Sequence, residues 1–235
     1  QKFKRRQIEV GMSDGIKIEV KNLTKRFGDL LVLDDMNFTI RKGEFLAIVG
    51  PTGCGKTTFL NCLSKLMPTS EGDLYIDGEP AENVAYGMEI KRWDKKLIEG
   101  KLDAILPLVG LADTAELYPN QVSASMVQRI AVARAFAVEP DLLMMDEPYG
   151  QLDIKLRFYL EDELVKLWKA LGSTVLFVTH NIEEAVYVAE RILVLTNKPT
   201  NIKKEIVVDL PRPRDTVSDD FIRIRKQVTE LIRWW

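Results

Sequence analysis

The sequence predicts an α/β fold built on a parallel sheet, and three patterns along the chain support this class. Apolar and polar residues alternate near the start, which is the two-residue period of half-buried strands. Further on, an unbroken apolar run leads into a glycine-rich loop and then into a helix-like stretch. In the second half, apolar strand candidates alternate with amphipathic stretches, which is typical of a parallel sheet covered by helices.

The first 80 residues are expected to be rich in strands. Alternation over residues 16–20 and 36–40 predicts two of them. The short run 74–76 ahead of Asp77-Gly78 predicts a third strand, which enters a hairpin turn. The pattern does not indicate which strand pairs with this third one.

From residue 81 onward the spacing of apolar side chains becomes helical, and the middle third shows no strand-like alternation. After Pro140 strands and helices alternate again, and prolines 211 and 213 end the last strand. The predicted strands here are residues 142–145, 174–178, 191–195 and 205–210, and the predicted helices are residues 152–171, a stretch from 182, and 221–235.

Composition excludes several classes of protein. The 235 residues carry 33 Lys plus Arg against 35 Asp plus Glu, a net charge of −2, so no global cationic field attracts nucleic acid. The longest apolar runs are far shorter than the roughly 20 residues that cross a bilayer. Only Cys54 and Cys62 are present, and the start has no signal-like apolar stretch, so we expect a reducing compartment.

The glycine-rich loop has the spacing G-x-x-x-x-G-K-[ST]. An apolar strand, residues 44–49, precedes it, and a helix begins near Lys56, which is the context that a phosphate-binding loop requires. Lys56 would reach the β and γ phosphates of ATP, and the Thr57 hydroxyl would bind Mg²⁺. We also expect the Cys54 thiol to be open to alkylation. The predicted phosphate loop comprises Gly50, Pro51, Thr52, Gly53, Cys54, Gly55, Lys56, Thr57 and Thr58.

Two further positions follow apolar strands and would meet the phosphate loop at one sheet edge. Asp146 and Glu147 come directly after residues 142–145. Asp146 would hold Mg²⁺, and Glu147 would act as the general base on the attacking water. His180, the only histidine, ends the run 174–179 and would contact the γ phosphate or that water.

These segments, in this order and spacing, resemble the nucleotide-binding subunit of an ATP-binding cassette (ABC) transporter over about residues 16–210. The quoted motifs are GPTGCGKTT, VSASMVQRIAVARAFAVEPDLLMMDEPYGQLD and VLFVTHNIEEAVYVAERILVL. Within the family, EIVVDLPRPRD and ENVAYGMEI resemble the nitrate, sulfonate, taurine and bicarbonate importer group. The implied architecture is a P-loop NTPase core with an antiparallel β subdomain and a helical subdomain.

The resemblance implies roles for further residues. Phe27 would stack on adenine, and Asp153 would belong to the loop that crosses between two ATPase subunits. The family signature appears here as VSASM, in which Ser123 and Ser125 would face the γ phosphate of the opposite subunit. Both signature glycines are absent, which predicts either a weakened homodimer or a heterodimer whose other subunit supplies a better signature.

A second departure lies between Pro80 and Ala81. The family has there a further strand, which ends in a glutamine that contacts Mg²⁺ and water, and no glutamine occurs from Thr69 to Asn120. Removing a core strand would expose a sheet edge at a cost that a marginally stable domain does not tolerate. We therefore expect the natural protein to contain a further segment here. An intact mass of 26.8 kDa would contradict this expectation.

The predicted protein is one ABC ATPase domain over residues 1–235. Its core, with the β subdomain, spans 16–80 and 136–210, its helical signature subdomain 81–135, and its C-terminal helix 215–235. It would bind ATP and Mg²⁺ and drive solute import through a separate transmembrane permease. The other expected partners are a second ATPase subunit and a solute-binding protein or domain. The chain would lie at the cytoplasmic face of the inner membrane. The solute would be a small anion such as nitrate, bicarbonate or a sulfonate. The alternatives are a weakly hydrolysing regulatory subunit and a soluble non-transport ABC ATPase.

Overall fold

The computed structural model describes residues 15–77, 79–80, 106–107, 110–114, 117, 121–123, 126–127, 129–130, 133, 140–150 and 154–232. The strands are β1 (Ile16–Phe27), β2 (Leu30–Arg41), β3 (Phe45–Val49), β4 (Glu71–Ile76), β5 (Glu79–Pro80), β6 (Leu142–Asp146), β7 (Thr174–Thr179), β8 (Arg191–Leu195) and β9 (Ile202–Val207). The helices are α1 (Lys56–Leu63), the 3₁₀ turn η3 (Ala112–Thr114), α5 (Ile154–Leu171), α6 (Ile182–Val188) and α7 (Asp219–Ile232).

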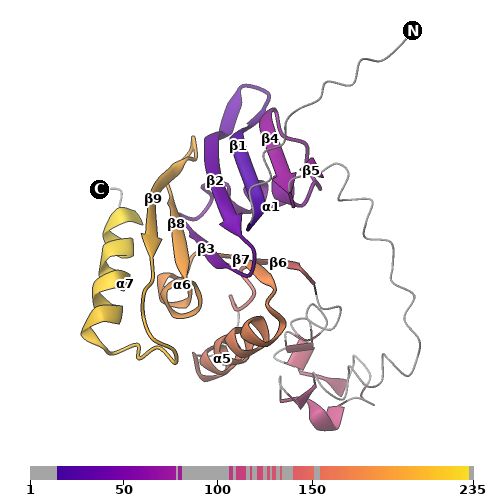
Figure 1. Cartoon of the computed structure of the whole chain (residues 1–235), viewed down its shortest axis with the longest axis vertical. Coiled ribbons are helices and arrows are strands. Elements are labelled where there is room, and N and C mark those ends of the chain that lie inside the picture. Colours follow the sequence, from indigo (N-terminus) through magenta and orange to yellow (C-terminus); the bar gives the residue numbers. More distant parts are fainter. Residues whose placement is uncertain are drawn as a thin grey trace.

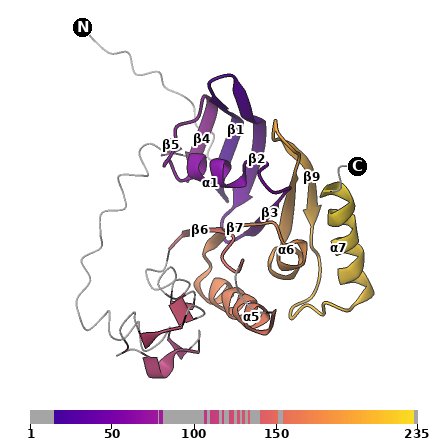
Figure 2. The ribbon, with the colours of Figure 1, turned by 180° about the vertical axis from the view of Figure 1, so that it is seen from behind.

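The strands form two sheets, and the predicted α/β class is confirmed. The first sheet is antiparallel with the order β2-β1-β4-β5, and the second has the order β6-β7-β3-β8-β9. In the second sheet β6, β7, β3 and β8 are parallel, whereas β9 is antiparallel to β8. Figure 1 shows α5 and α6 on one side of this sheet and the antiparallel sheet on the other. Figure 2 shows α1 packed against the antiparallel sheet.

The structure adds pairings that the sequence pattern did not indicate. The strand predicted at 74–76 is the end of β4, which pairs with β1 and places Ile76 opposite Ile18. The last strand was predicted at 205–210, but β9 ends at Val207. Val207 pairs with Arg191, the first residue of β8, and beyond it the Val208 amide donates to the Glu190 carbonyl at 2.8 Å, where β8 has not yet begun. The predicted subdomain 81–135 lies mostly outside the described residues, and its boundaries stay predictions.

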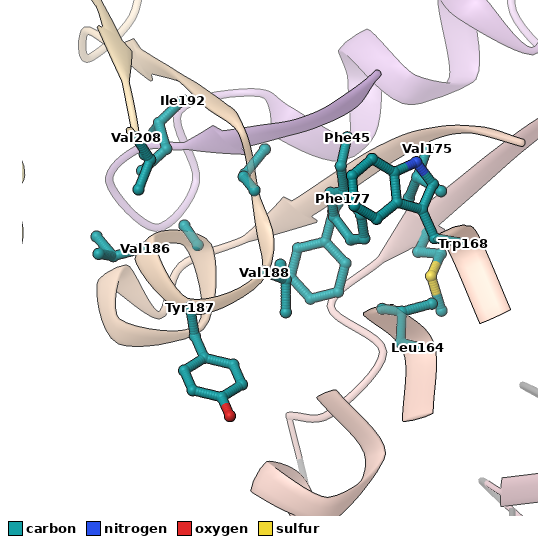
Figure 3. Close-up of a cluster of buried hydrophobic side chains, with 14 of the residues drawn as sticks. Phe45, Leu164, Trp168, Val175, Phe177, Val186, Tyr187, Val188, Ile192 and Val208 are labelled. Atoms are coloured by element: carbon teal, nitrogen blue, oxygen red, sulfur yellow. The ribbon is translucent and has the colours of Figure 1, made fainter. Parts of the chain in front are cut away.

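The central strand β3 is buried on both faces, which explains its unbroken apolar sequence. Phe45, Ala47 and Val49 face a cluster that α5, α6 and α7 cover, shown in Figure 3. Within it, the rings of Phe45 and Trp168 meet edge to face at 5.5 Å between centroids. Leu46 and Ile48 face a second cluster, formed with α1 and the antiparallel sheet.

The segment after β9 fastens the end of α6. Arg214 is buried, and its Nη1 donates to the carbonyls of Val186 at 2.7 Å and Tyr187 at 3.0 Å, while its Nη2 donates to Val208 at 2.9 Å. Carbonyls at a helix end have no partners within the helix, so a guanidinium satisfies several of them at once. Burial and the neighbouring Arg212 lower the pKa of Arg214 to about 9. This contact fixes α6, the helix that follows His180.

Glu161 is a buried carboxyl group in α5. It is 1% exposed, and within the described part of the chain neither of its carboxyl oxygens has a hydrogen-bond partner. Burial raises its pKa to about 8, with the charges of Glu184, Glu183 and Asp162 adding to the rise and that of Arg157 opposing it. We therefore expect the folded protein to bind a proton at Glu161 more tightly than the unfolded chain does.

We expect this group to make stability fall as pH rises. Between the ordinary pKa of 4.5 and about 8, the folded state binds more protons than the unfolded state. Each unit of pKa difference corresponds to about 1.4 kcal/mol, and water penetration reduces the effect of burial, so we expect a loss of about 2 kcal/mol from pH 5 to pH 8. Urea unfolding of wild type and Glu161→Gln across this range measures it. The variant should lose this component, whereas the exposed control Glu230→Gln should follow wild type. Parallel profiles for wild type and Glu161→Gln would contradict the prediction.

Among the helices that the structure describes, none combines the length and the apolar character required to cross a membrane.

Candidate functional site

The four parallel strands end at one edge of the second sheet, and each is followed there by a polar segment. β6 ends at Asp146, β7 is followed by His180, and β3 leads into the phosphate loop. β8 leads into a turn, residues 196–201. Since β3 lies between β7 and β8, the phosphate loop has His180 on one side and this turn on the other.

The phosphate loop depends on glycine at Gly55. Its φ angle is +120°, which side chains rarely adopt, and an added Cβ would lie 3.0 Å from Cγ1 of Val32. The loop is closed by the Cys54 amide, which donates to the Pro51 carbonyl at 3.2 Å. Helix α1 begins at the next residue, Lys56, so its positive end faces the loop. This geometry supplies backbone N–H groups and a helix N-terminus to an anion.

Lys56 is buried within the loop. Its Nζ donates to the carbonyls of Gly50 at 3.1 Å and Pro51 at 3.2 Å, and the residue is 6% exposed. These contacts keep an ammonium group inside the loop. A phosphate oxygen of higher charge density would compete with the carbonyls for this donor.

The expectation that Cys54 is open to alkylation is wrong for this structure. Cys54 is 2% exposed, and an added Cβ on Gly50 would lie 3.0 Å from its Sγ. Burial raises the pKa of the thiol, so less of the reactive thiolate forms. The side chain packs against the core, whereas the backbone of the loop faces the cleft.

Thr57 and Asp146 meet across the cleft. The Thr57 hydroxyl donates to Oδ2 of Asp146 at 2.9 Å, and both side chains are exposed there. A hydroxyl and a carboxylate oxygen are the hard donors that Mg²⁺ prefers, and a nucleotide phosphate and water complete such a site without further protein ligands. The pair therefore fits a magnesium ion at the phosphate loop.

Glu147 and His180 also meet at this edge. His180 Nδ1 lies 3.1 Å from Oε1 of Glu147, and both side chains remain about half exposed. Glu147 has a φ of 46°, unusual for a residue with a side chain, and its amide donates to the Val178 carbonyl at 2.8 Å. Such backbone strain persists only where the surroundings hold it, and it gathers at functional sites. The strand ends thus aim this carboxylate at the cleft.

A buried network holds the two residues that flank His180. The Thr179 hydroxyl donates to Glu184 at 2.7 Å, and the Asn181 side chain caps α6 by accepting from the Glu183 amide at 3.0 Å. The Asn181 amide group donates to Glu184 at 3.1 Å, and Arg157 in the first turn of α5 lies 3.5 Å from the same carboxylate. The backbone at His180 is therefore fixed from both sides.

A cleft of about 430 Å³, within the range of ligand pockets, lies at this edge, and His180 is not among its described lining residues. It brings together most of the predicted phosphate loop, both acids after β6 and one cation that sequence reasoning missed. That cation is Lys198, which no motif singles out. The described lining residues are Thr52, Gly53, Gly55, Lys56, Thr57, Thr58, Asp146, Glu147 and Lys198.

The remaining predicted residues lie elsewhere or outside the described chain. Phe27 is 46% exposed at the end of β1, with Lys25 Nζ 5.0 Å from its ring centroid, and it does not line the described cleft. The exposed Ser123 accepts from the Met126 amide at 3.3 Å, as a helix N-cap does. Ser125 and Asp153 fall outside the described residues. Their roles toward a second subunit stay predictions.

Comparison with known proteins identifies relatives along nearly the whole chain. A family model described as ABC transporter matches residues 33–99. An uncharacterised ABC transporter ATP-binding protein of Methanocaldococcus jannaschii is 36% identical and covers 93% of this chain and 92% of the relative. The aliphatic sulfonates import ATP-binding protein SsuB of Bacillus licheniformis is 36% identical, covering 92% of this chain and 93% of the relative.

The alignment with the Methanocaldococcus jannaschii protein contains positions that have no residue in this chain. It extends over 245 positions, whereas 93% of 235 residues is about 219, so about 26 positions have no residue here. The expectation of a further segment between Pro80 and Ala81 stays a prediction.

Solved structures give the same result for the fold. A dimeric bacterial ABC transporter cassette matches with a TM-score of 0.71 at 27% identity, covering 83% of this chain and 100% of the other. A post-hydrolysis state bound to ADP and phosphate matches with a TM-score of 0.70 at 26% identity and the same coverage. With these matches and the phosphate loop geometry, the chain belongs to the ABC transporter ATP-binding family and is an ATPase of that family.

Proposed function

We propose that this chain is the ATP-hydrolysing subunit of an ABC importer for a small anion. The convergence of Thr57 with Asp146, and of Glu147 with His180, beside the phosphate loop carries the hydrolytic part of this proposal. The import part rests on the likeness to sulfonate import proteins at about 35% identity over nearly the whole chain. A sulfonate, nitrate or bicarbonate is the proposed solute.

Each residue at the edge would have a distinct task in hydrolysis. Lys56 and the loop amides stabilise the negative charge that develops on the transferred phosphoryl group. Thr57 and Asp146 would hold Mg²⁺, which supplies charge neutralisation when bound. Glu147 accepts a proton from the attacking water, and His180 keeps Glu147 in place and contacts the γ phosphate.

The proposed partners are a second ATPase subunit, a transmembrane permease and a solute-binding protein or domain. A second subunit would close over the nucleotide with Ser123, Ser125 and Asp153, and Phe27 would support adenine. ABC ATPases resembling this one include a cassette solved as a dimer, which supports the two-subunit arrangement. The assembly would place this chain peripherally at the cytoplasmic face of the inner membrane.

Purification of the native complex tests this proposal. A tagged chain should copurify with a membrane subunit that mass spectrometry identifies, and loss of the chain should abolish uptake of a labelled sulfonate, nitrate or bicarbonate. Recovery with ribosomes or nucleic acid alone would contradict it and favour a non-transport ATPase. The same preparation gives the intact mass of the chain, which tests for a segment between Pro80 and Ala81.

The altered signature VSASM favours a second candidate, a regulatory subunit that binds ATP and hydrolyses it slowly. Side chains in place of the signature glycines would hold the γ phosphate of the opposite subunit farther away. The assembled complex separates the two candidates. An importer ATPase should turn over far faster than its Glu147→Gln variant, whereas a regulatory subunit should not.

A further inference from the structure

Lys198 extends the phosphate cleft beyond the motif residues. It lies in the turn between β8 and β9, residues 196–201, and lines the cleft together with Lys56. Because β8 pairs with β3 in parallel, the end of β8 lies beside the start of the phosphate loop. The turn therefore approaches the loop on the side opposite His180.

The turn that carries Lys198 is closed by its own hydrogen bonds. The Thr196 amide donates to the Asn201 carbonyl at 2.9 Å, and the Asn201 amide donates to the Thr196 hydroxyl at 2.9 Å. The Thr196 hydroxyl also lies 3.2 Å from the Pro199 carbonyl, which it can donate to. Lys198 thus projects from a defined backbone.

Thr200 ties this turn to the phosphate loop and to β2. Its hydroxyl donates to the Cys54 carbonyl within the loop. Its amide donates to the Val32 carbonyl at 2.9 Å, and its carbonyl accepts from the Asp34 amide at 2.9 Å. Thr200 is fully buried, so the attachment is protected from water. The loop and the turn are therefore joined through Thr200.

The charge of Lys198 is available to a ligand. Over the described residues its ammonium has neither an ion-pair partner nor a hydrogen-bond acceptor. Although burial raises the pKa of the Cys54 thiol, the charges of Lys56 and Lys198 oppose that rise, which reflects how near both cations lie to the loop. The described lining of the cleft has two carboxylates and two ammonium groups, so Lys198 together with Lys56 balances the charge of Asp146 and Glu147 and favours binding of an anion as highly charged as a nucleotide.

We infer that Lys198 is a second cationic residue for the α and β phosphates of the nucleotide. The inference rests on the proposed function at this same site. The turn is attached at Cys54, beside Gly55, where loop amides cradle the α and β phosphates, whereas Lys56 reaches the β and γ phosphates. Lys198 therefore acts in nucleotide binding and contributes equally to ATP and ADP, which share those two phosphates.

Isothermal titration of the full chain with MgATP and with MgADP tests this inference. The variants are Lys198→Gln, Lys198→Arg and the control Lys204→Gln, an exposed lysine on β9, each made together with Glu147→Gln so that ATP persists. We expect Lys198→Gln to raise both Kd values about 5- to 10-fold, Lys198→Arg to restore most of the affinity, and the control to change neither. In the background with Glu147 intact, KM should rise by the same factor with kcat unchanged.

The outcomes separate this inference from the proposed function. If Lys198→Gln leaves both Kd values within about two-fold of the parent, or weakens ATP without weakening ADP, the assignment of Lys198 is overturned. If the parent chain fails to bind ATP, or Lys56→Ala does not weaken binding, the proposed nucleotide site itself is overturned. Unchanged thermal unfolding of Lys198→Gln is expected because the side chain is exposed.

Discussion

Replacement of Glu147 by glutamine is expected to lower kcat for ATP hydrolysis about 10³-fold while ATP affinity stays within a few fold of wild type. The amide keeps the size and the hydrogen-bonding reach of the side chain, but it cannot accept a proton from water. Glu147 lies beside His180 and is held by its own backbone bond to Val178, so the substitution should not displace the strand end. Phosphate release measured in the assembled complex gives kcat.

Two measurements make this result specific to Glu147. Titration with MgATP should show that the variant still binds, because the phosphate loop is unchanged. Glu230→Gln, an exposed glutamate on α7, should hydrolyse ATP at the wild-type rate. A Glu147→Gln protein with full activity would show that another group acts as the base.

The His180→Ala variant should lose about 10²-fold in kcat. The substitution removes the contact that His180 Nδ1 makes with Glu147 and the donor proposed for the γ phosphate. The backbone should be preserved, because Thr179 and Asn181 remain tied to Glu184. The loss should therefore appear in kcat, with little change in the Kd for MgATP.

A conservative change next to His180 provides the control. Asn181→Ser keeps an oxygen that can cap α6, so most of the activity should remain. If His180→Ala and Asn181→Ser lost equal amounts of kcat, the effect of His180 would be explained by the position of α6 alone. A His180→Ala protein with the wild-type rate would refute its catalytic assignment.

The sequence predicted where residues lie when they directly follow a strand along the chain. The phosphate loop, Asp146, Glu147 and His180 each directly follow an apolar strand, and parallel strands bring such ends to one edge. Predicting their relative position required only the alternation of strands and helices along the sequence. For the same reason β3, β6, β7 and β8 were predictable to within a residue or two.

Features that depend on strand order could not be predicted in this way. Lys198 enters the cleft only because β8 lies directly beside β3, a pairing that no short motif encodes. β4 pairs with β1, about 50 residues earlier, so periodicity alone could not identify its partner. Cys54 is buried because the loop turns its side chain toward Gly50 and into the second hydrophobic cluster, whereas its position in the motif pointed to solvent.

The two faces of β3 have a consequence for how the protein unfolds. The residues of β3 contribute alternately to both hydrophobic clusters, as do those of β7 and β8. Neither cluster can lose its packing without exposing the strands that complete the other, so the described core should melt as one cooperative unit. A nucleotide bound at the loop after β3 would then protect amide hydrogens far from the cleft against exchange, in both clusters and to a similar degree.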